Sequence, residues 1–273
     1  MPTTPAKNLL YRAALPILAP RSRGQMTHHV FGHPLTTLPN YERILAKHHV
    51  FGASLLLQDG ANCALCDTST ANPEHLAQEN TLYRVASITK MATALVTLRC
   101  IDNGLFALDS EAASLLPDGE KTPALSGVTV RQLLCHTSGL RDLPILDDCL
   151  KEGKPYTELL RQPEIRACAP GQQLIYSNFG FGLLGCILEQ QTGLCIEPLF
   201  QEMLFRPLHM RATLDASTLN EAEIMPITRV LPYRAGQELR VTALGRHPLQ
   251  KPNAITGIRQ EQCIPTVGLF CRC

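Results

Sequence analysis

Hydrophobic and polar positions along the chain predict strands near the beginning and helices in the middle. Residues 50–57 are mostly apolar and are followed by Asp59-Gly60, a turn pair typical of β-hairpins. Residues 62–68 alternate between apolar and polar side chains and predict the returning strand. Residues 41–49 predict a helix before this hairpin. The opening unit is therefore expected to be a helix followed by two antiparallel strands.

Helical patterns dominate the next part of the sequence. The most apolar helix is predicted over residues 87–103, with Gly104 as its C-terminal stop. Thr129 and Gln132 have the Thr-x-x-Gln spacing of a capping box, which opens a short helix over 130–135. The remaining predicted elements are a helix over 179–191 closed by Gly193, a helical stretch over 195–210 with breaks at Pro198 and Pro207, and weaker strands at 230–231 and 239–243.

Composition and charge exclude several classes of function. The 273 residues can bury a sizeable core in one large or two small domains. With 45% hydrophobic and 18% charged residues, the balance is that of a globular protein. The net charge of +1 and the absence of Trp give no basic surface or stacking platform for nucleic acid. No segment reaches the roughly 18 apolar residues of a membrane span. We therefore expect no nucleic-acid partner and no membrane span.

Cysteine usage and the N-terminal segment bear on location. The 11 cysteines are scattered, several within apolar helical patterns where free thiols behave as small hydrophobes. This favours a reducing compartment, and a cytoplasmic location is the expectation. Residues 1–25 are basic and mildly apolar, but Arg12 and Pro16 interrupt the apolar run of a signal peptide. They predict a disordered extension before a domain over 26–273, or a true start at Met26.

The segment RVASITK, residues 84–90, carries the strongest candidate chemistry. Ser87 and Lys90 are three residues apart at the start of the predicted apolar helix, so their side chains share a face. The positive end of the helix favours an alkoxide at Ser87 and disfavours a protonated Lys90. This pattern indicates a nucleophile with its own base. The alternative interpretation is an N-cap serine followed by a solvated lysine.

A second candidate motif, Tyr176-Ser177-Asn178, lies on a turn just before the helix at 179–191. A tyrosine beside a lysine can be held as a phenolate or can shuttle a proton. An asparagine two residues later can hydrogen-bond a substrate amide while it contacts the lysine. The pair of motifs favours the catalytic interpretation of Ser87 over the capping one.

Three separated segments, RVASITK, LLCHTSGL and PGQQLIYSNFGFGLLGCILEQQTG, resemble the serine β-lactamase and penicillin-binding-protein superfamily over about residues 51–210. The most similar branch has a Tyr-x-Asn second motif and contains class C β-lactamases, D-alanyl-D-alanine carboxypeptidases and related esterases. The resemblance implies Ser87 as the acylated nucleophile, with Lys90 and Tyr176 as the proton-transfer pair. It further implies Asn178 as a substrate contact and the Ser87 N–H as half of an oxyanion hole. No metal or organic cofactor is needed.

The same resemblance predicts an α/β (α+β) fold. This fold has an antiparallel sheet flanked by helices and a mostly helical inserted region at about residues 105–240. The third motif of the family, Lys/His-Thr-Gly on an edge strand, is absent from the sequence; Gln191 and Ile255 precede the two remaining Thr-Gly pairs. The tail resembles the family's Asn-Ala…Gly-Leu-Phe segment, after which the sequence stops. We therefore interpret the chain as lacking its C-terminal part, with an incomplete sheet, through natural truncation, a frameshift or the choice of segment.

Cysteines and histidines suggest a different class, a zinc or redox module. Cys63 and Cys66 lie on a predicted strand, where residues three apart point to opposite faces, and no second Cys-x-x-Cys follows. The histidine doublets at 28–29 and 48–49 are interpreted as solvated side chains. His136, within HTSG, is interpreted as a structural hydrogen-bonding residue. No metal site is expected.

Two hypotheses of function follow. The first is a serine hydrolase that acts through an acyl-enzyme on a β-lactam, a D-Ala-terminated peptide or a small ester. The second is a non-catalytic remnant that keeps the nucleophile but cannot complete its oxyanion hole, a loss that costs on the order of 10²–10³ in rate. The expected partner is a small-molecule or peptide substrate, and the oligomeric state is left open. The cytoplasmic expectation differs from the periplasmic or secreted location of many family members.

Overall fold

The computed structural model divides the chain into two compact units. One contains Met1–Leu82, Asn220–Leu249 and Cys273, and the other contains Tyr83–Leu219 and Gln250–Arg272. The structure describes residues 25–31, 44, 52–59, 62–69, 81–117, 122–146, 156–215, 219–220, 224, 232–235, 238–241 and 270–271. The predicted extension over residues 1–25 lies outside the described residues except for Gln25. The boundaries of that extension and of the inserted helical region stay predictions.

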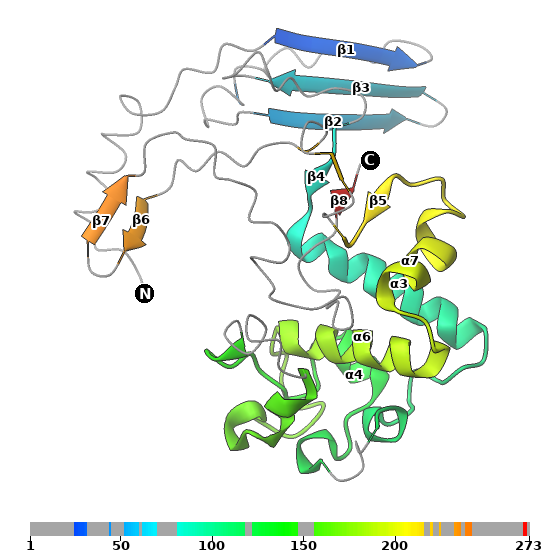
Figure 1. The fold of residues 1–273 in the computed structure, drawn as a ribbon, viewed down its shortest axis with the longest axis vertical. Helices are drawn as coiled ribbons and strands as arrows, with labels where there is room; N and C mark the ends of the chain where they lie inside the picture. The colour runs from blue at the N-terminus through cyan, green and yellow to red at the C-terminus, as the bar shows by residue number, and fades with distance from the viewer. Residues whose placement is uncertain are drawn as a thin grey trace. The chain divides into compact units, whose positions relative to one another are not determined.

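The first unit contains a three-stranded antiparallel sheet in the order β1-β3-β2, drawn as arrows in Figure 1. Strands β2 (Gly52–Asp59) and β3 (Asn62–Ser69) pair with Asp59 opposite Asn62, which confirms the predicted hairpin. Strand β1 (Gln25–Phe31) pairs with the other edge of β3 and was not predicted. Two consecutive histidines in the middle of β1 interrupt the apolar alternation that marks a strand.

Other predictions for this unit have mixed outcomes. Strands β6 (Pro232–Ala235) and β7 (Glu238–Val241) form a hairpin. The strand predicted at 239–243 overlaps β7, whereas the one predicted at 230–231 lies outside the described residues. Of the helix predicted over 41–49, only Ile44 is described, and it is helical.

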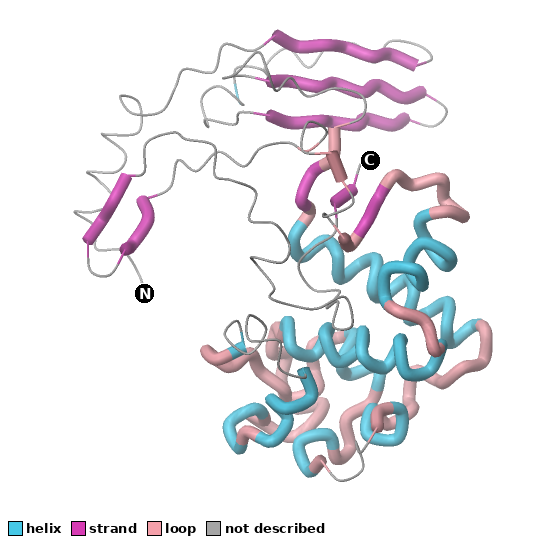
Figure 2. The backbone as a smooth tube through the Cα atoms, viewed as in Figure 1, coloured by secondary structure: helices cyan, strands magenta, loops and turns pink. Residues whose placement is uncertain are grey.

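The second unit is mainly helical (Figure 2, cyan) and also contains a small antiparallel sheet in the order β4-β8-β5. Its α-helices are α3 (Thr89–Asp102), α4 (Val130–Leu134), α6 (Asn178–Thr192) and α7 (Ile196–Phe200). Its other helical turns are η1 (Ala86–Ile88), η2 (Ala112–Leu115), η4 (Pro123–Leu125), η5 (Tyr156–Arg161), η6 (Pro163–Ile165) and the π-helical η7 (Gln201–Phe205). Its strands are β4 (Tyr83–Arg84), β5 (Ala212–Thr213) and β8 (Phe270–Cys271).

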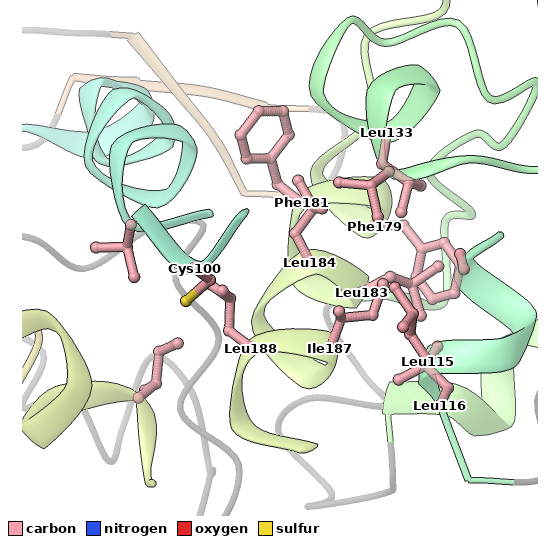
Figure 3. Close-up of a cluster of buried hydrophobic side chains, with 14 of the residues drawn as sticks. Cys100, Leu115, Leu116, Leu133, Phe179, Phe181, Leu183, Leu184, Ile187 and Leu188 are labelled. Atoms are coloured by element: carbon pink, nitrogen blue, oxygen red, sulfur yellow. The ribbon is translucent and has the colours of Figure 1, made fainter. Parts of the chain in front are cut away.

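Helix α6 is the centre of the core of this unit, because it packs against α3, α4, α7 and η2. Its apolar side chains are buried on most sides, as expected for a helix with an almost continuous hydrophobic surface. Figure 3 shows Leu133 of α4 on one side of α6 and Cys100 of α3 on the other. The Ser177 hydroxyl caps the start of α6 by accepting from Gly180 N at 2.9 Å. Tyr176 and Asn178 are thereby held at the end of a rigid, buried helix.

Local signals in the sequence define some of the helix ends of this unit. The capping box is confirmed, since Thr129 and Gln132 exchange side-chain and backbone hydrogen bonds at the start of α4. Gly193 ends α6 in the left-handed conformation, with φ of 69°. The predicted break at Pro198 is wrong, because Pro198 lies in the first turn of α7, where a missing N–H breaks no intrahelical bond. The helical path then continues into η7 and ends before Pro207.

No single helix among the described residues is long and apolar enough to cross a membrane. The helical segments Asn178–Thr192 and Ile196–Phe205 together reach the required length and composition, but they are bent by 84° at the break between them.

The backbone around Gly139 leaves no room for a side chain, and a substitution can test this. Its φ is +77°, and an added Cβ would collide with the Cys168 carbonyl oxygen. Gly139→Ala is therefore expected to lower the free energy of unfolding by about 3 kcal/mol, from left-handed strain and a backbone clash together. Gly193→Ala is the matched control, because φ is +69° there but nothing lies within 4 Å of the added Cβ, so about 1 kcal/mol is expected. Urea unfolding of both variants measures the difference, and equal losses would contradict the clash.

Candidate active site

Ser87 is presented by a strained turn. It lies in the 3-10 turn η1, and the α-helix begins two residues later than predicted, at Thr89. The preceding Ala86 has φ of 47°, a conformation that side chains other than glycine rarely adopt. The Thr89 hydroxyl secures this turn by donating to the Ala86 carbonyl at 2.6 Å. Ser87 is exposed, so its hydroxyl is open to a ligand.

The capping interpretation of Ser87 is wrong. Neither η1 nor α3 has a side-chain hydrogen bond at its N-cap. Lys90, the other residue of that interpretation, is not solvated, because its residue exposure is only 6%. Both side chains are instead directed to one another, with Lys90 Nζ 3.5 Å from Ser87 Oγ.

Lys90 is held on several sides by polar and aromatic groups. Its Nζ donates to Asn178 Oδ1 at 2.7 Å and to Ser87 Oγ at 3.5 Å. The same nitrogen lies 4.9 Å from the centre of the Tyr176 ring and 5.7 Å from that of Phe181. A buried amine needs such partners, because an unpaired charge away from water is costly. The lysine is therefore fixed in place beside the serine hydroxyl.

Tyr176 approaches the same serine from the start of α6. Its Oη lies 2.9 Å from Ser87 Oγ, and the side chain is 51% exposed. Partial burial acts to raise the pKa of the phenol, but interactions with Lys90 and Ser87 and the positive charge of Lys90 outweigh it, so the pKa is lowered. A phenol with a lowered pKa gives up its proton more readily than a free tyrosine, which is what a proton acceptor for Ser87 requires.

Asn178 connects Lys90 to Asp142, a residue that the sequence did not predict to be part of the site. Its Oδ1 accepts from Lys90, and its Nδ2 donates to Asp142 Oδ2 at 2.7 Å. Asp142 Oδ1 accepts from Ser177 Oγ at 3.1 Å and from Phe179 N at 2.8 Å. Nothing local in the sequence marks Asp142, since its partners lie 35 to 37 residues further along the chain. The role of Asn178 as a substrate contact stays a prediction.

His136 has the structural role expected from the sequence. Its Nδ1 accepts from the backbone N–H of Ser177 at 3.2 Å, and its ring centre lies 4.5 Å from that of Tyr176 and 5.0 Å from that of Phe181. Burial and, to a smaller extent, the charge of Lys90 lower the pKa of the imidazole. The charge of Asp142 acts in the opposite direction but does not outweigh them. A neutral ring is required for Nδ1 to accept a hydrogen bond. His136 therefore supports Tyr176 and the turn before α6.

The cysteines that suggested a metal or redox role lie elsewhere. Cys63 and Cys66 are on β3 in the first unit, as the strand prediction required, and their side chains lie outside the described residues. Within the described part of the chain, no group of three or more His, Cys, Asp or Glu side chains is arranged to hold a metal ion. Burial raises the pKa of Cys100 to about 11 and, with the charge of Glu189, that of Cys186 to about 12. A raised pKa leaves less of each thiol in the reactive thiolate form.

The fold and the site together define a class of protein. A buried lysine and a tyrosine that precedes α6 converge on one serine oxygen in the turn before α3. The family model for Beta-lactamase matches residues 40–249, so the chain belongs to this family. The resemblance inferred from the three sequence motifs is confirmed.

Curated relatives include proteins of different kinds. The chain is 28% identical over 225 residues to penicillin-binding protein 4 of Amycolatopsis lactamdurans, a match that covers 74% of the chain and 58% of that protein. It is 32% identical over 157 residues to the monacolin J acid methylbutanoyltransferase of Aspergillus terreus, covering 48% of the chain and 37% of that protein. The chain thus spans between about a third and three fifths of the length of these relatives.

A solved structure supports the fold assignment. The crystal structure of a penicillin-binding protein from Bacillus halodurans matches 84% of the chain and 69% of that protein with a TM-score of 0.62 and 18% identity. At this identity the match shows the fold alone. The predicted α/β class is confirmed, and the sheets among the described residues contain no more than three strands each, in agreement with the prediction of an incomplete sheet.

Proposed function

We propose that the chain is a serine hydrolase of the β-lactamase and carboxypeptidase type that works through an acyl-enzyme on Ser87. The observation that carries the proposal is the convergence of two proton-transfer groups on one exposed hydroxyl. Tyr176 Oη lies 2.9 Å and Lys90 Nζ 3.5 Å from Ser87 Oγ. Hydroxyl oxygens both donate and accept, so the proton between Ser87 and Tyr176 can move in either direction.

The proposed reaction has two balanced steps. In the first, Ser87 Oγ forms a bond to the substrate carbonyl carbon, its proton passes to Tyr176 with Lys90, and the same groups return a proton to the leaving group as its bond breaks. In the second, the oxygen of water or of another acceptor gives its proton to the same pair and forms a bond to the acyl carbon. The pair returns that proton to Ser87 Oγ as the bond between Ser87 and the acyl group breaks. The Ser87 N–H at the helix start supplies one oxyanion donor. The proton-transfer pair is needed in both steps.

The proposed substrates are a β-lactam, a D-Ala-terminated peptide or a small ester. A penicillin-binding protein and an acyltransferase are both among the relatives, which supports acyl transfer as the shared chemistry rather than one substrate. The second candidate is a non-catalytic remnant, in which the oxyanion hole at Ser87 is not completed. Acylation without useful turnover is an intermediate case between the two.

Probe labelling tests the proposal. Purified protein is incubated with a fluorescent fluorophosphonate or a fluorescent penicillin, and the labelled peptide is identified by mass spectrometry. We expect the adduct on Ser87. A folded protein that neither probe labels favours the remnant, whereas a label on another residue contradicts the assignment of Ser87. Release of the label over time measures turnover.

Tyr176→Phe is expected to slow the labelling of Ser87 by about 10²-fold or more, because it removes a general base or acid while keeping the aromatic ring. In the wild type the labelling rate should rise with pH through a midpoint below the ordinary pKa of tyrosine, since the phenol pKa is lowered and the phenolate is the accepting form. The labelling rate between pH 6 and 10 is the measurement. A variant that keeps both the wild-type rate and the wild-type pH dependence would exclude Tyr176 from proton transfer.

A further inference from the structure

Asp142 contacts none of the atoms that converge on Ser87, yet it is one hydrogen bond away from the residue that holds Lys90. Both carboxylate oxygens are used. Oδ1 accepts from Ser177 Oγ at 3.1 Å and Phe179 N at 2.8 Å, and Oδ2 accepts from Asn178 Nδ2 at 2.7 Å. The carboxylate thus lies at the positive N-terminal end of α6, where a negative charge is favoured.

The chemistry of these groups dictates which way the Asn178 amide faces. An amide side chain has one accepting end and one donating end, whereas an ionised carboxylate only accepts. Asp142 therefore requires the NH₂ end, and the oxygen of the amide is left to face Lys90, which it meets at 2.7 Å. An amide turned the other way would present a donor to the lysine, which has no accepting capacity when it is protonated.

Asp142 is also fixed from its own side of the chain. The neighbouring Arg141 N donates to the Ile165 carbonyl at 3.0 Å, and Ala167 N donates to the Gly139 carbonyl at 2.8 Å. Leu140 and Arg166 form the bridge between these two hydrogen bonds. The carboxylate is therefore anchored by a segment other than α6 and can act as a fixed reference for the amide.

We propose that Asp142 is a positioning residue that sets the orientation of the Asn178 amide and so holds Lys90 Nζ beside Ser87 Oγ. The inference rests on the proposed function, because the position of Lys90 matters for catalysis only if Ser87 is the nucleophile. The placement of the lysine is nevertheless a structural property that can be measured without any reaction. Asp142 acts through Asn178 and touches no reacting atom.

Asp142→Asn tests whether Asp142 sets the orientation of the Asn178 amide, because it changes the hydrogen-bonding groups of the side chain but hardly its shape. The new side chain keeps an oxygen for Ser177 and Phe179, so its NH₂ faces Asn178, whose amide turns and presents a donor to Lys90. We expect the labelling rate of Ser87 to fall by about 10- to 100-fold, the effect of misplacing a reacting group. Asp109→Asn is the matched control, since it makes the same change of charge at an exposed carboxylate paired with Arg131 at 2.8 Å. It should label at the wild-type rate.

Exchange of the two side chains separates positioning from general loss of structure. Asn178→Asp places two carboxylates against each other and is expected to label slowly. In the double variant Asp142→Asn/Asn178→Asp, the new asparagine donates to the new carboxylate, which again offers an oxygen to Lys90. The double variant should label severalfold faster than Asn178→Asp and than Asp142→Asn. A double variant no faster than Asn178→Asp would overturn the inference, even if Asp142→Asn did not fold.

Crystal structures of the wild type and of Asp142→Asn give a readout that does not depend on activity. We expect Lys90 Nζ to leave the position 3.5 Å from Ser87 Oγ in the variant. An unchanged lysine overturns the positioning role, whether or not the protein is labelled. A displaced lysine in a protein whose wild type is never labelled leaves the positioning role intact and contradicts the proposed function alone.

Discussion

Ser87→Ala is expected to abolish covalent labelling by fluorophosphonate and penicillin probes, with a rate at least about 10⁶-fold below that of the wild type, as for removal of the nucleophile in other serine enzymes. The substitution removes the one oxygen that both Tyr176 and Lys90 contact. Because Ser87 is exposed and caps no helix, the variant should unfold at a temperature close to that of the wild type. The effect is therefore on chemistry and not on folding.

Ser114→Ala provides the matched control for this experiment. Ser114 is also exposed, and its hydroxyl donates to the Glu111 carbonyl at 2.9 Å in the same unit as the site. It should be labelled at the wild-type rate. Labelling that persists in Ser87→Ala at the rate of Ser114→Ala would show that another side chain carries the adduct.

Lys90→Met is expected to lower the labelling rate by about 10³-fold, within the range for loss of a positioned proton-transfer group. Methionine fills a similar volume but cannot donate, so Asn178 Oδ1 and Ser87 Oγ both lose a hydrogen bond. The Tyr176 phenol loses the nearby positive charge that lowers its pKa, and its pKa should rise. The remaining activity should consequently move to higher pH.

The control for the lysine is Arg99→Met on the same helix. Arg99 is exposed in the last turn of α3, so the change removes a cation of similar length away from the site. Stopped-flow labelling between pH 6 and 10 and thermal unfolding are measured for both variants. A Lys90→Met variant that remains folded and reacts as fast as Arg99→Met would exclude the lysine from the proton-transfer pair.

Local patterns in the sequence correctly predicted the elements that are determined by residues close together in the chain. The hairpin of β2 and β3 follows from its turn pair, the start of α4 from Thr129 and Gln132, and the end of α6 from Gly193. Pro198 was misread because a proline is compatible with a first helical turn and incompatible only with later ones. Strand β1 was missed because its pairing with β3, rather than its own composition, makes it a strand.

The sequence predicted those residues of the site that belong to short motifs. The spacing of Ser87 and Lys90 is a property of one helix start. Tyr176 and Asn178 were found as a motif on the turn before a helix, and the resemblance to the family then implied their roles. Asp142 was not found, because it acts by contacts with residues 35 to 37 positions away and follows no pattern of its own. The catalytic roles of the four predicted residues stay predictions for the experiments described above, as does the cytoplasmic location.

The described residues that converge on Ser87 all come from the second unit, Tyr83–Leu219. The hydrogen bonds around Ser87 are thus encoded within one part of the chain. Substitutions in the first unit are expected to change the labelling rate of Ser87 less than substitutions of the residues that contact it. A screen of chemically diverse acyl donors is more informative than a screen confined to penicillins, because these contacts define a proton-transfer group and not one substrate.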